Sequence, residues 1–353
     1  YNNLISRDSK DYNPISNRTG GTTGKPLHFL VDRRQRFLQL AEKFYHWENY
    51  GYRFRDKMVV LRSRVIDENI SSKNPWRFDW VQNIMYLSSY HLNEDTMYKY
   101  FKLLKYWSPK YMQAYPSSAY QLATFFEKEN LDWNIDIIFT SSETLPDYVK
   151  EKVEKTFSCK VVDHYGHGEP GMWVTSKCKC NNYKPNPLTS LLEIENDDAN
   201  FQIRGSGELI ETSLINYSMP FIRYKLGDNI ELNKGCCQYS NESEIISNIN
   251  GRKADFLIIG DKKVSGAILH NQVSKNINNV KNMQIIQRDI GKLILNIVPT
   301  RDFNEADREY LVKSFHTRIG KSMRLDINLV PKLTISKNGK LSYVKNQLEN
   351  YEK

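Results

Sequence analysis

The feature that most constrains the fold is an alternation of strand-like and helix-like segments between residues 58 and 163. The strand-like runs are short, apolar and rich in Val and Ile, and they lie at residues 58–61, 135–140 and 160–163. The helix-like segments, with start signals at Asn93 and Pro116, lie at residues 94–106, 117–128 and 146–156. Because strands that alternate with helices pair in parallel, this region predicts an α/β sheet. Such sheets bind ligands at the carboxyl ends of their strands, which is where residues 141–145 and 163–170 lie.

The pattern changes twice further along the chain. Short strands are expected at residues 191–194, 207–212 and 229–232. From about Gly251, strands at 256–259, 293–298 and 327–330 alternate with helices at about 266–276 and 304–319. We therefore expect a large N-terminal α/β domain over residues 1–250 and a small C-terminal α+β domain over residues 251–353. The chain begins at Tyr1 without an initiator methionine, so we expect the large domain to be truncated at its N-terminus.

A further helix is expected between residues 32 and 51. Its apolar side chains recur at helical spacing, at Phe37, Leu38, Leu40, Ala41, Phe44 and Tyr45.

The charge of the chain narrows the classes of partner. The formal net charge is +9, but lysines and arginines are scattered among acidic residues, without a basic helix stripe or a zinc-finger spacing. A nucleic-acid-binding protein is therefore the least favoured class, and a basic surface suited to phosphate-bearing small ligands fits better. No apolar run approaches the roughly 20 residues that span a bilayer, and no membrane partner is expected.

Five cysteines bear on redox state and metal binding. Their odd number, without a visible signal peptide, indicates a reducing compartment, and we expect a cytoplasmic location. Cys159 borders an expected strand and is interpreted as a buried structural thiol. Cys178 with Cys180, and Cys236 with Cys237, form two close pairs that can hold Zn²⁺ between thiolates. Four unrelated reduced thiols are the alternative.

The segment from residue 19 to residue 26 has the composition of a phosphate-binding loop. Glycines allow close approach of the backbone to an anion, threonine hydroxyls and backbone N–H groups donate hydrogen bonds, and a lysine adds charge. The spacing is not that of a Walker A loop, and a flexible surface turn is the alternative. The residues expected to contact phosphate are Thr19, Gly20, Gly21, Thr22, Thr23, Gly24 and Lys25.

Further along the chain, four more polar segments follow in order. They lie at residues 163–169, 223–228, 251–255 and 338–340. Tyr165 offers a flat face for adenine, and Asp163 can accept from an exocyclic amine. Asp228 can accept hydrogen bonds from ribose hydroxyls, and Glu169 is a hard oxygen ligand for Mg²⁺. Lys340, together with Arg252, can stabilise negative charge that develops on a phosphate.

The order and the residues of these segments resemble the motifs of the adenylate-forming superfamily of acyl-CoA synthetases, luciferases and adenylation domains. The resemblance is to its phenylacetate–CoA ligase branch, with the CapK and coenzyme F390 synthetase-like proteins, and it spans about residues 17–345. The segments typical of that branch are Ser141-Ser142-Glu143-Thr144-Leu145, Asp163-His164-Tyr165-Gly166 and Phe221-Ile222-Arg223-Tyr224.

The resemblance implies the following site. Lys340 would be the catalytic lysine, carried by a C-terminal domain that moves between half-reactions, and Glu169 would hold Mg²⁺. The four paired cysteines would hold a structural zinc. Besides the 19–25 loop, the ATP- and AMP-binding residues would be Ser142, Glu143, Asp163, His164, Tyr165, Gly166, Asp228 and Arg252.

Three positions depart from the pattern of the family. Gly20 stands where serine is frequent, and Gly168 where threonine or serine is common. Ala254 occupies the usual hinge position of Asp or Lys, which puts domain rotation and thioester formation in question; Asp255 is the alternative hinge.

The resemblance implies an ATP-dependent, AMP-forming ligase that activates a carboxylic acid as an acyl-adenylate, releases pyrophosphate, and passes the acyl group to CoA. Two alternatives remain: an amide-forming ligase with an amine acceptor such as an amino sugar, and a non-catalytic nucleotide-binding homologue. Candidate residues for the acid pocket are Met85, Tyr86, Tyr115 and His167.

Overall fold

The computed structural model describes most of the 353 residues. The described residues are 4–18, 27–62, 76–89, 92–168, 175–177, 182–196, 198–234, 244–252, 256–260, 262–266, 269, 270, 273, 277, 279–334 and 341–348; for 250–252, 262, 263 and 265 only the backbone is described. The chain forms two compact units. Unit 1 comprises Tyr1–Leu145, Lys150–Leu226 and Ile230–Ile249, and unit 2 comprises Pro146–Val149, Gly227–Asn229 and Asn250–Lys353.

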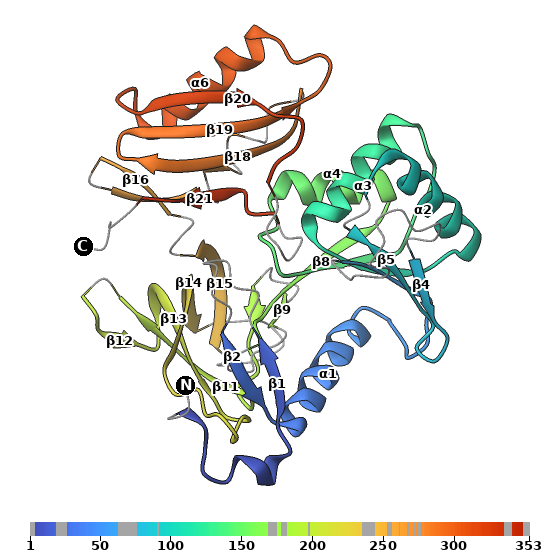
Figure 1. Cartoon of the computed structure of the whole chain (residues 1–353), viewed down its shortest axis with the longest axis vertical. Helices are drawn as coiled ribbons and strands as arrows, with labels where there is room; N and C mark the ends of the chain where they lie inside the picture. Colours follow the sequence, from blue (N-terminus) through green and yellow to red (C-terminus); the bar gives the residue numbers. More distant parts are fainter. Residues whose placement is uncertain are drawn as a thin grey trace. The chain divides into compact units, whose positions relative to one another are not determined.

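Parallel strands form one part of the sheet of unit 1 (Figure 1). These strands lie in the order β5-β3-β6-β7-β8, and β4 pairs antiparallel with β5 at the edge. The strands are β3 (Met58–Arg62), β4 (Trp76–Asp79), β5 (Ile84–Ser88), β6 (Tyr111–Ala114), β7 (Ile137–Thr140) and β8 (Lys160–Tyr165). The parallel pairing expected from the sequence is confirmed. Two boundaries were wrong: β7 begins at Ile137, two residues after the expected start, and β8 continues to Tyr165, two residues beyond the expected end.

Helix α1 (Arg33–Glu48) confirms the helix expected between residues 32 and 51, but it presents the opposite face to the interior. Phe37, Leu40 and Tyr45, which carried the helical spacing, are 65%, 44% and 67% exposed. Polar residues of the same helix are buried instead. In its last turns, Trp47 is buried in an apolar cluster that includes Phe139 and Val162 of the sheet. In Figure 1, α1 lies between the parallel strands and the hairpin formed by β1 (Ile15–Arg18) and β2 (His28–Val31).

Helices α2 (Glu94–Trp107) and α3 (Pro116–Lys128) also form where the sequence predicts them. Asn93 caps α2 by accepting a hydrogen bond from the backbone of Thr96 at 2.9 Å, and Pro116 occupies the first turn of α3. Phe101 packs edge-on against Phe126 at 5.4 Å between ring centroids, which joins the two helices through their apolar sides. Helix α4 (Asp147–Phe157) then leads into β8.

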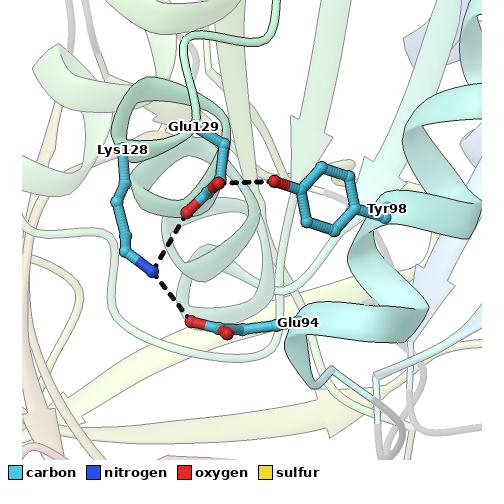
Figure 2. A network of polar contacts seen from close by, with 4 residues as sticks. All are labelled: Glu94, Tyr98, Lys128 and Glu129. Carbon is cyan, nitrogen blue, oxygen red and sulfur yellow. Dashed lines mark hydrogen bonds and ion pairs between the residues drawn. The ribbon is translucent and has the colours of Figure 1, made fainter.

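A polar network on the surface spans α2 and α3 (Figure 2). Lys128 Nζ lies 2.8 Å from Glu94 Oε1 and 3.0 Å from Glu129 Oε1, and the hydroxyl of Tyr98 donates to Glu129. The lysine and Glu94 side chains are more than half exposed, so solvent screens their attraction and we expect the network to stabilise the fold little.

An antiparallel region completes unit 1 by extending the sheet beyond β8. Its strands follow in the order β9-β10-β15-β14-β13-β11-β12 and enclose an apolar core that includes Leu192, Leu209 and Ile230. The bounds are β9 (Thr175–Lys177), β10 (Tyr183–Lys184), β11 (Ser190–Glu195), β12 (Phe201–Gln202), β13 (Gly205–Ser213), β14 (Tyr224–Lys234) and β15 (Glu244–Arg252). The short strands expected at 191–194, 207–212 and 229–232 are confirmed within β11, β13 and β14.

Unit 2 has an α+β core. A four-stranded sheet in the order β20-β19-β18-β21 packs against α6 (Glu305–Ile319), and Leu293, Leu311 and Phe315 are fully buried between them (Figure 1). Asn304 and Asp307 form a reciprocal capping box at the start of α6. The strands are β16 (Phe256–Ile259), β17 (Lys262–Ser265), β18 (Val280–Asp289), β19 (Lys292–Pro299), β20 (Arg324–Leu329) and β21 (Val344–Asn346). No helix in the described ranges is long and apolar enough to cross a membrane.

Candidate active site

The carboxyl ends of β6, β7 and β8 lie side by side, because the three strands pair in parallel register. Ala114 pairs with Thr140, and Thr140 pairs with Asp163. The segments that follow these strands therefore emerge along one edge of the sheet, where open α/β sheets bind their ligands. Residues 141–145, which were singled out from the sequence, lie at this edge.

Asp163 is buried at this edge, with both carboxylate oxygens engaged. Thr140 Oγ1 donates to Oδ1 at 2.6 Å, and the hydroxyl of Tyr183 donates to Oδ2 at 2.6 Å. Burial, followed by the charge of Asp163, raises the pKa of Tyr183, which therefore stays a hydrogen-bond donor at neutral pH. Each carboxylate oxygen has two lone pairs, so Asp163 keeps the capacity to accept from a ligand amine.

Ser142 and Arg62 meet across the ends of β7 and β3. Ser142 adopts φ +70°, a strained backbone conformation for a non-glycine residue, and its Oγ accepts from Arg62 Nη2 at 2.6 Å. The Arg62 guanidinium also lies 4.6 Å from the ring centroid of Tyr115, which is buried at the start of α3. Arg62 was missed from the sequence; its position as the last residue of β3 is the signal that could have pointed to it.

Glu143 is held by α3. Its two carboxylate oxygens accept from the backbone N–H and the hydroxyl of Ser117, each at 3.0 Å. A carboxylate at a helix N-terminus stabilises the first turn. These contacts give the Glu143 side chain a structural role in fixing the 141–145 segment against α3.

His164 points to the other face of the strand from Asp163 and Tyr165, because successive side chains of a strand alternate. Its imidazole packs against His46 of α1 at 5.3 Å between ring centroids. Burial lowers the pKa of His46 to about 4, and burial also lowers the pKa of His164, helped by the positive charge of Arg62 and Lys43. The two imidazoles are therefore neutral at physiological pH. His164 contacts α1 rather than the side of the strand that carries Asp163.

Tyr165 and His167 continue from the end of β8. The half-buried Tyr165 ring lies 5.9 Å from the His167 ring. Gly166 lies between them in the sequence. The space beside Gly168 is open, because a Cβ atom added there would meet no other atom within 4 Å. His167 Nε2 lies 2.9 Å from Glu211 Oε2, and these two side chains are 9% and 0% exposed. Glu211 was also missed from the sequence, since nothing local in β13 distinguishes it.

The remaining described candidates lie on separate elements. Asp228 is buried within β14, one residue after Gly227 at φ +77°. Met85 and Tyr86 are neighbours on β5, so their side chains point to opposite faces of the sheet. A pocket on one face of the sheet can use only one of the two.

Several candidates lie outside the described residues. They are Thr19, Gly20, Gly21, Thr22, Thr23, Gly24 and Lys25, together with Glu169, Cys178, Cys180, Cys236, Cys237 and Lys340. For Arg252, only the backbone in β15 is described. Within the ranges that are described, no three His, Cys, Asp or Glu side chains gather as a metal site. The phosphate loop, the Mg²⁺ ligand and the zinc site therefore remain predictions.

Cys159 is described, as a free thiol between α4 and β8. Its Sγ lies 3.8 Å from the carbonyl oxygen of Val153, and burial raises its pKa to about 12. This environment favours the protonated, unreactive form expected of a structural thiol.

Comparisons with known proteins show what the chain is similar to. Residues 259–347 match the family model of the CapK C-terminal domain. Protein CapK of Staphylococcus aureus is 27% identical over 341 residues, which cover 94% of this chain and 74% of that protein.

Solved structures show the fold of the whole chain. The 2-hydroxyisobutyryl-CoA ligase in complex with R3-HIB-AMP aligns with 98% of this chain and 74% of its own, at a TM-score of 0.70 and 18% identity. The amide bond synthetase McbA of Marinactinospora thermotolerans covers 91% of this chain and 65% of its own, at a TM-score of 0.62 and 12% identity. The resemblance to adenylate-forming enzymes and the α/β fold class expected from the sequence are confirmed.

Proposed function

We propose that the chain is an ATP-dependent, AMP-forming ligase that activates a carboxylic acid as an acyl-adenylate. The observation that carries the proposal is the end of β8, where a buried Asp163 and the half-buried Tyr165 share one face of a parallel strand. The fold likeness to a CoA ligase in complex with an acyl-adenylate supports it. ATP and reduced cysteines are typical of the cytoplasm, where we expect the reaction.

The described residues would bind adenosine. Tyr165 would stack on the adenine ring, while Asp163, fixed by Thr140 and Tyr183, would accept a hydrogen bond from the exocyclic amine. Because both hydroxyl donors orient the carboxylate before a ligand arrives, little reorganisation is needed on binding. Asp228 would accept from the ribose hydroxyls.

The phosphates would be held by residues that the structure does not describe. The 19–25 loop would donate to the β- and γ-phosphates, and Arg252 would contact ribose or phosphate. Glu169 would hold Mg²⁺, which, when bound, neutralises phosphate charge. Lys340 would place its ammonium between the acid carboxylate and the α-phosphate. As the carboxylate oxygen attacks phosphorus and pyrophosphate leaves, Lys340 would stabilise the negative charge on the transferring group.

The acceptor of the acyl group distinguishes two versions of this function. CoA is the first candidate, and the fold likeness to a CoA ligase supports it. An amine acceptor is the second candidate, and the fold likeness to an amide bond synthetase, together with Ala254 at the expected hinge, favours it. Mass analysis of products after adding CoA or an amino sugar to the preformed adenylate separates the two.

Pyrophosphate release tests the function itself. The purified chain is incubated with ATP, Mg²⁺ and a panel of aryl, alkyl, hydroxylated and amino acids. Release that depends on the acid is expected, and Lys340→Ala should reduce it by at least about 100-fold, because one group that stabilises transition-state charge is removed. Lys332→Ala, at an exposed lysine of the same unit, is the matched control and should retain activity.

Two results contradict the proposal. If Lys340→Ala releases pyrophosphate as fast as the wild type, that lysine does not have the proposed role. ATP binding by calorimetry, without release for any acid, favours the non-catalytic nucleotide-binding alternative.

A further inference from the structure

Helix α1 buries a polar face. Gln35, Gln39, Glu42 and His46, which we call the polar stripe, are spaced four, three and four residues apart and so lie on one side of the helix. Gln35 and His46 are 0% exposed and Gln39 is 3% exposed. A helix that buries glutamines and exposes Phe37 departs from the arrangement that the hydrophobic effect favours, in which apolar side chains face the interior.

Much of the hydrogen-bonding capacity of the polar stripe is unused. Among the described residues, neither Oε1 nor Nε2 of Gln35 nor Nε2 of Gln39 has a hydrogen-bond partner. The same holds for Nδ1 of His164, which faces α1. Buried polar atoms are nearly always hydrogen-bonded in folded proteins, to protein, water or ligand. This concentration of free donors and acceptors along one face therefore indicates a site for a polar ligand.

The polar stripe reaches the segment that ends β8 at two points. His46 packs on His164, at 5.3 Å between ring centroids. Nearer the middle of the helix, Glu42 accepts from Asn186 Nδ2 at 2.6 Å and lies within electrostatic range of Glu211. Glu211 is in turn 2.9 Å from His167. Buried polar groups therefore run from α1 to both His164 and His167, on either side of Tyr165.

We propose that the polar stripe, with Glu211 and His167, determines the specificity of the acid site and selects an acid that carries several hydroxyl groups. This inference rests on the proposed function. The glutamine amides can donate and accept, and the Glu42 carboxylate can accept, so a chain of hydroxyl groups satisfies them in alternation. An alkyl or aryl acid of similar size leaves these buried atoms unpaired, and sites built to hydrogen-bond a substrate reject such analogues strongly.

The test compares D-gluconate with hexanoate, which has the same six-carbon chain without hydroxyl groups, and with the aryl acid phenylacetate. We expect kcat/KM in pyrophosphate release to be at least about 100-fold higher for gluconate than for hexanoate. Gln39→Leu should raise the KM for gluconate about tenfold or more, leave the KM for ATP unchanged, and narrow the preference over hexanoate. Gln121→Leu, at an exposed position of α3, is the matched control and should change none of these values.

A binding measurement makes the test independent of turnover. Gluconate should raise the thermal midpoint of the wild-type chain and of Gln121→Leu, and raise it less in Gln39→Leu. The midpoint of unliganded Gln39→Leu should equal or exceed that of the wild type, because a buried amide nitrogen without a hydrogen-bond partner is removed.

Three results would overturn the inference. The first is a preference for phenylacetate or hexanoate, which leaves the proposed ligase function standing. The second is a lower midpoint of unliganded Gln39→Leu with an unchanged KM for gluconate, the result expected if the amide only binds structural water. The third is the absence of any midpoint shift with gluconate. If no acid on the wider panel releases pyrophosphate, the proposed function fails separately.

Discussion

Gln35 in unit 1 and Gln287 in unit 2 are both completely buried, but they use their amide groups differently. Gln287 donates to the carbonyl of Ile258 and accepts from its N–H, both at 2.7 Å, and so joins β18 to β16. The Gln35 amide has no hydrogen-bond partner among the described residues. The same side chain is therefore structural in one unit and, on our account, reserved for a ligand in the other.

The histidines extend this comparison. In unit 2, the buried His270 bonds to the carbonyl of Met283 through Nε2 at 2.9 Å. In unit 1, His164 is buried with Nδ1 unpartnered in the described part of the chain. Paired polar groups in a core fix its geometry, whereas unpaired ones reduce stability and persist where function requires them. The comparison concerns these residues and not the whole of each core, because Gln284 of unit 2 is also buried with an unpartnered Oε1 among the described residues.

The largest predicted effect is in unit 2. Gln287→Leu removes two hydrogen bonds and leaves the N–H and carbonyl of Ile258 unpaired, so it should lower the free energy of unfolding of that unit by about 2–4 kcal/mol. Hydrogen exchange of β16 and β18 amides measures this change. Gln284→Leu, which loses one described bond, to Ser342, should cost about half as much. Equal stability of Gln287→Leu and wild type would show that the paired amide is not structural.

Acidification should weaken both units, and unit 1 more. Burial lowers the pKa of His46 and of His270 to about 4. Unfolded histidine binds a proton near pH 6.5, so the unfolded state takes up protons that the folded state does not, and stability falls as the pH drops from 6.5 towards 4. Between pH 7.5 and 5, each of these two histidines should cost about 2 kcal/mol.

His164, whose pKa is also lowered by burial, adds to the loss in unit 1. Hydrogen exchange of α1 and β18 amides at the two pH values compares the units. In His46→Phe, the α1 amides should lose less stability between pH 7.5 and 5 than in the wild type. The loss measured at the β18 amides should be unchanged. An equal pH dependence of α1 in His46→Phe and wild type would contradict the assignment.

Gln35→Leu should have a smaller effect of opposite sign. An amide without hydrogen bonds is replaced by an apolar side chain of similar length, so the free energy of unfolding should stay equal or rise by up to about 1 kcal/mol. This free energy is measured by urea denaturation in which unfolding is monitored through the hydrogen exchange of α1 amides. A loss of 2 kcal/mol or more would show that the Gln35 amide already has partners, and the contrast with Gln287 would disappear.

The smallest effect is expected at the surface network of Figure 2. Lys128→Ala removes the contacts to Glu94 and Glu129. Because the Lys128 and Glu94 side chains are more than half exposed, this change should produce no resolvable shift in thermal midpoint. A clear fall in the midpoint would mean that this network, rather than the ring packing beneath it, joins α2 to α3.

The sequence predicted which segments form helices and strands better than it predicted which faces are buried. Local patterns contain start signals such as Asn93, and the structure confirms the helix that begins there. The spacing of Phe37, Leu40 and Tyr45 also predicted a helix correctly. It could not show that the opposite side of that helix faces inward, because burial depends on what the rest of the chain places beside each face.

The candidate site shows the same limit. Asp163 and Tyr165 could be singled out because they belong to a short segment with a family pattern. Arg62 and Glu211 could not, since each reaches its partner, Ser142 or His167, from a distant part of the sequence. Unpaired side chains such as Gln35 are recognised only in the folded structure, because an amide in a helical sequence looks the same whether or not it finds a partner.

The most direct test of the central claim is mass analysis of a single turnover with ATP, Mg²⁺ and a hydroxylated acid, in the absence of CoA or an amine. The account predicts an acyl-adenylate of that acid, with one pyrophosphate released for each, and a loss of both in Lys340→Ala. Intact ATP bound to the chain, with no adenylate formed from hydroxylated, alkyl or aryl acids, would contradict it.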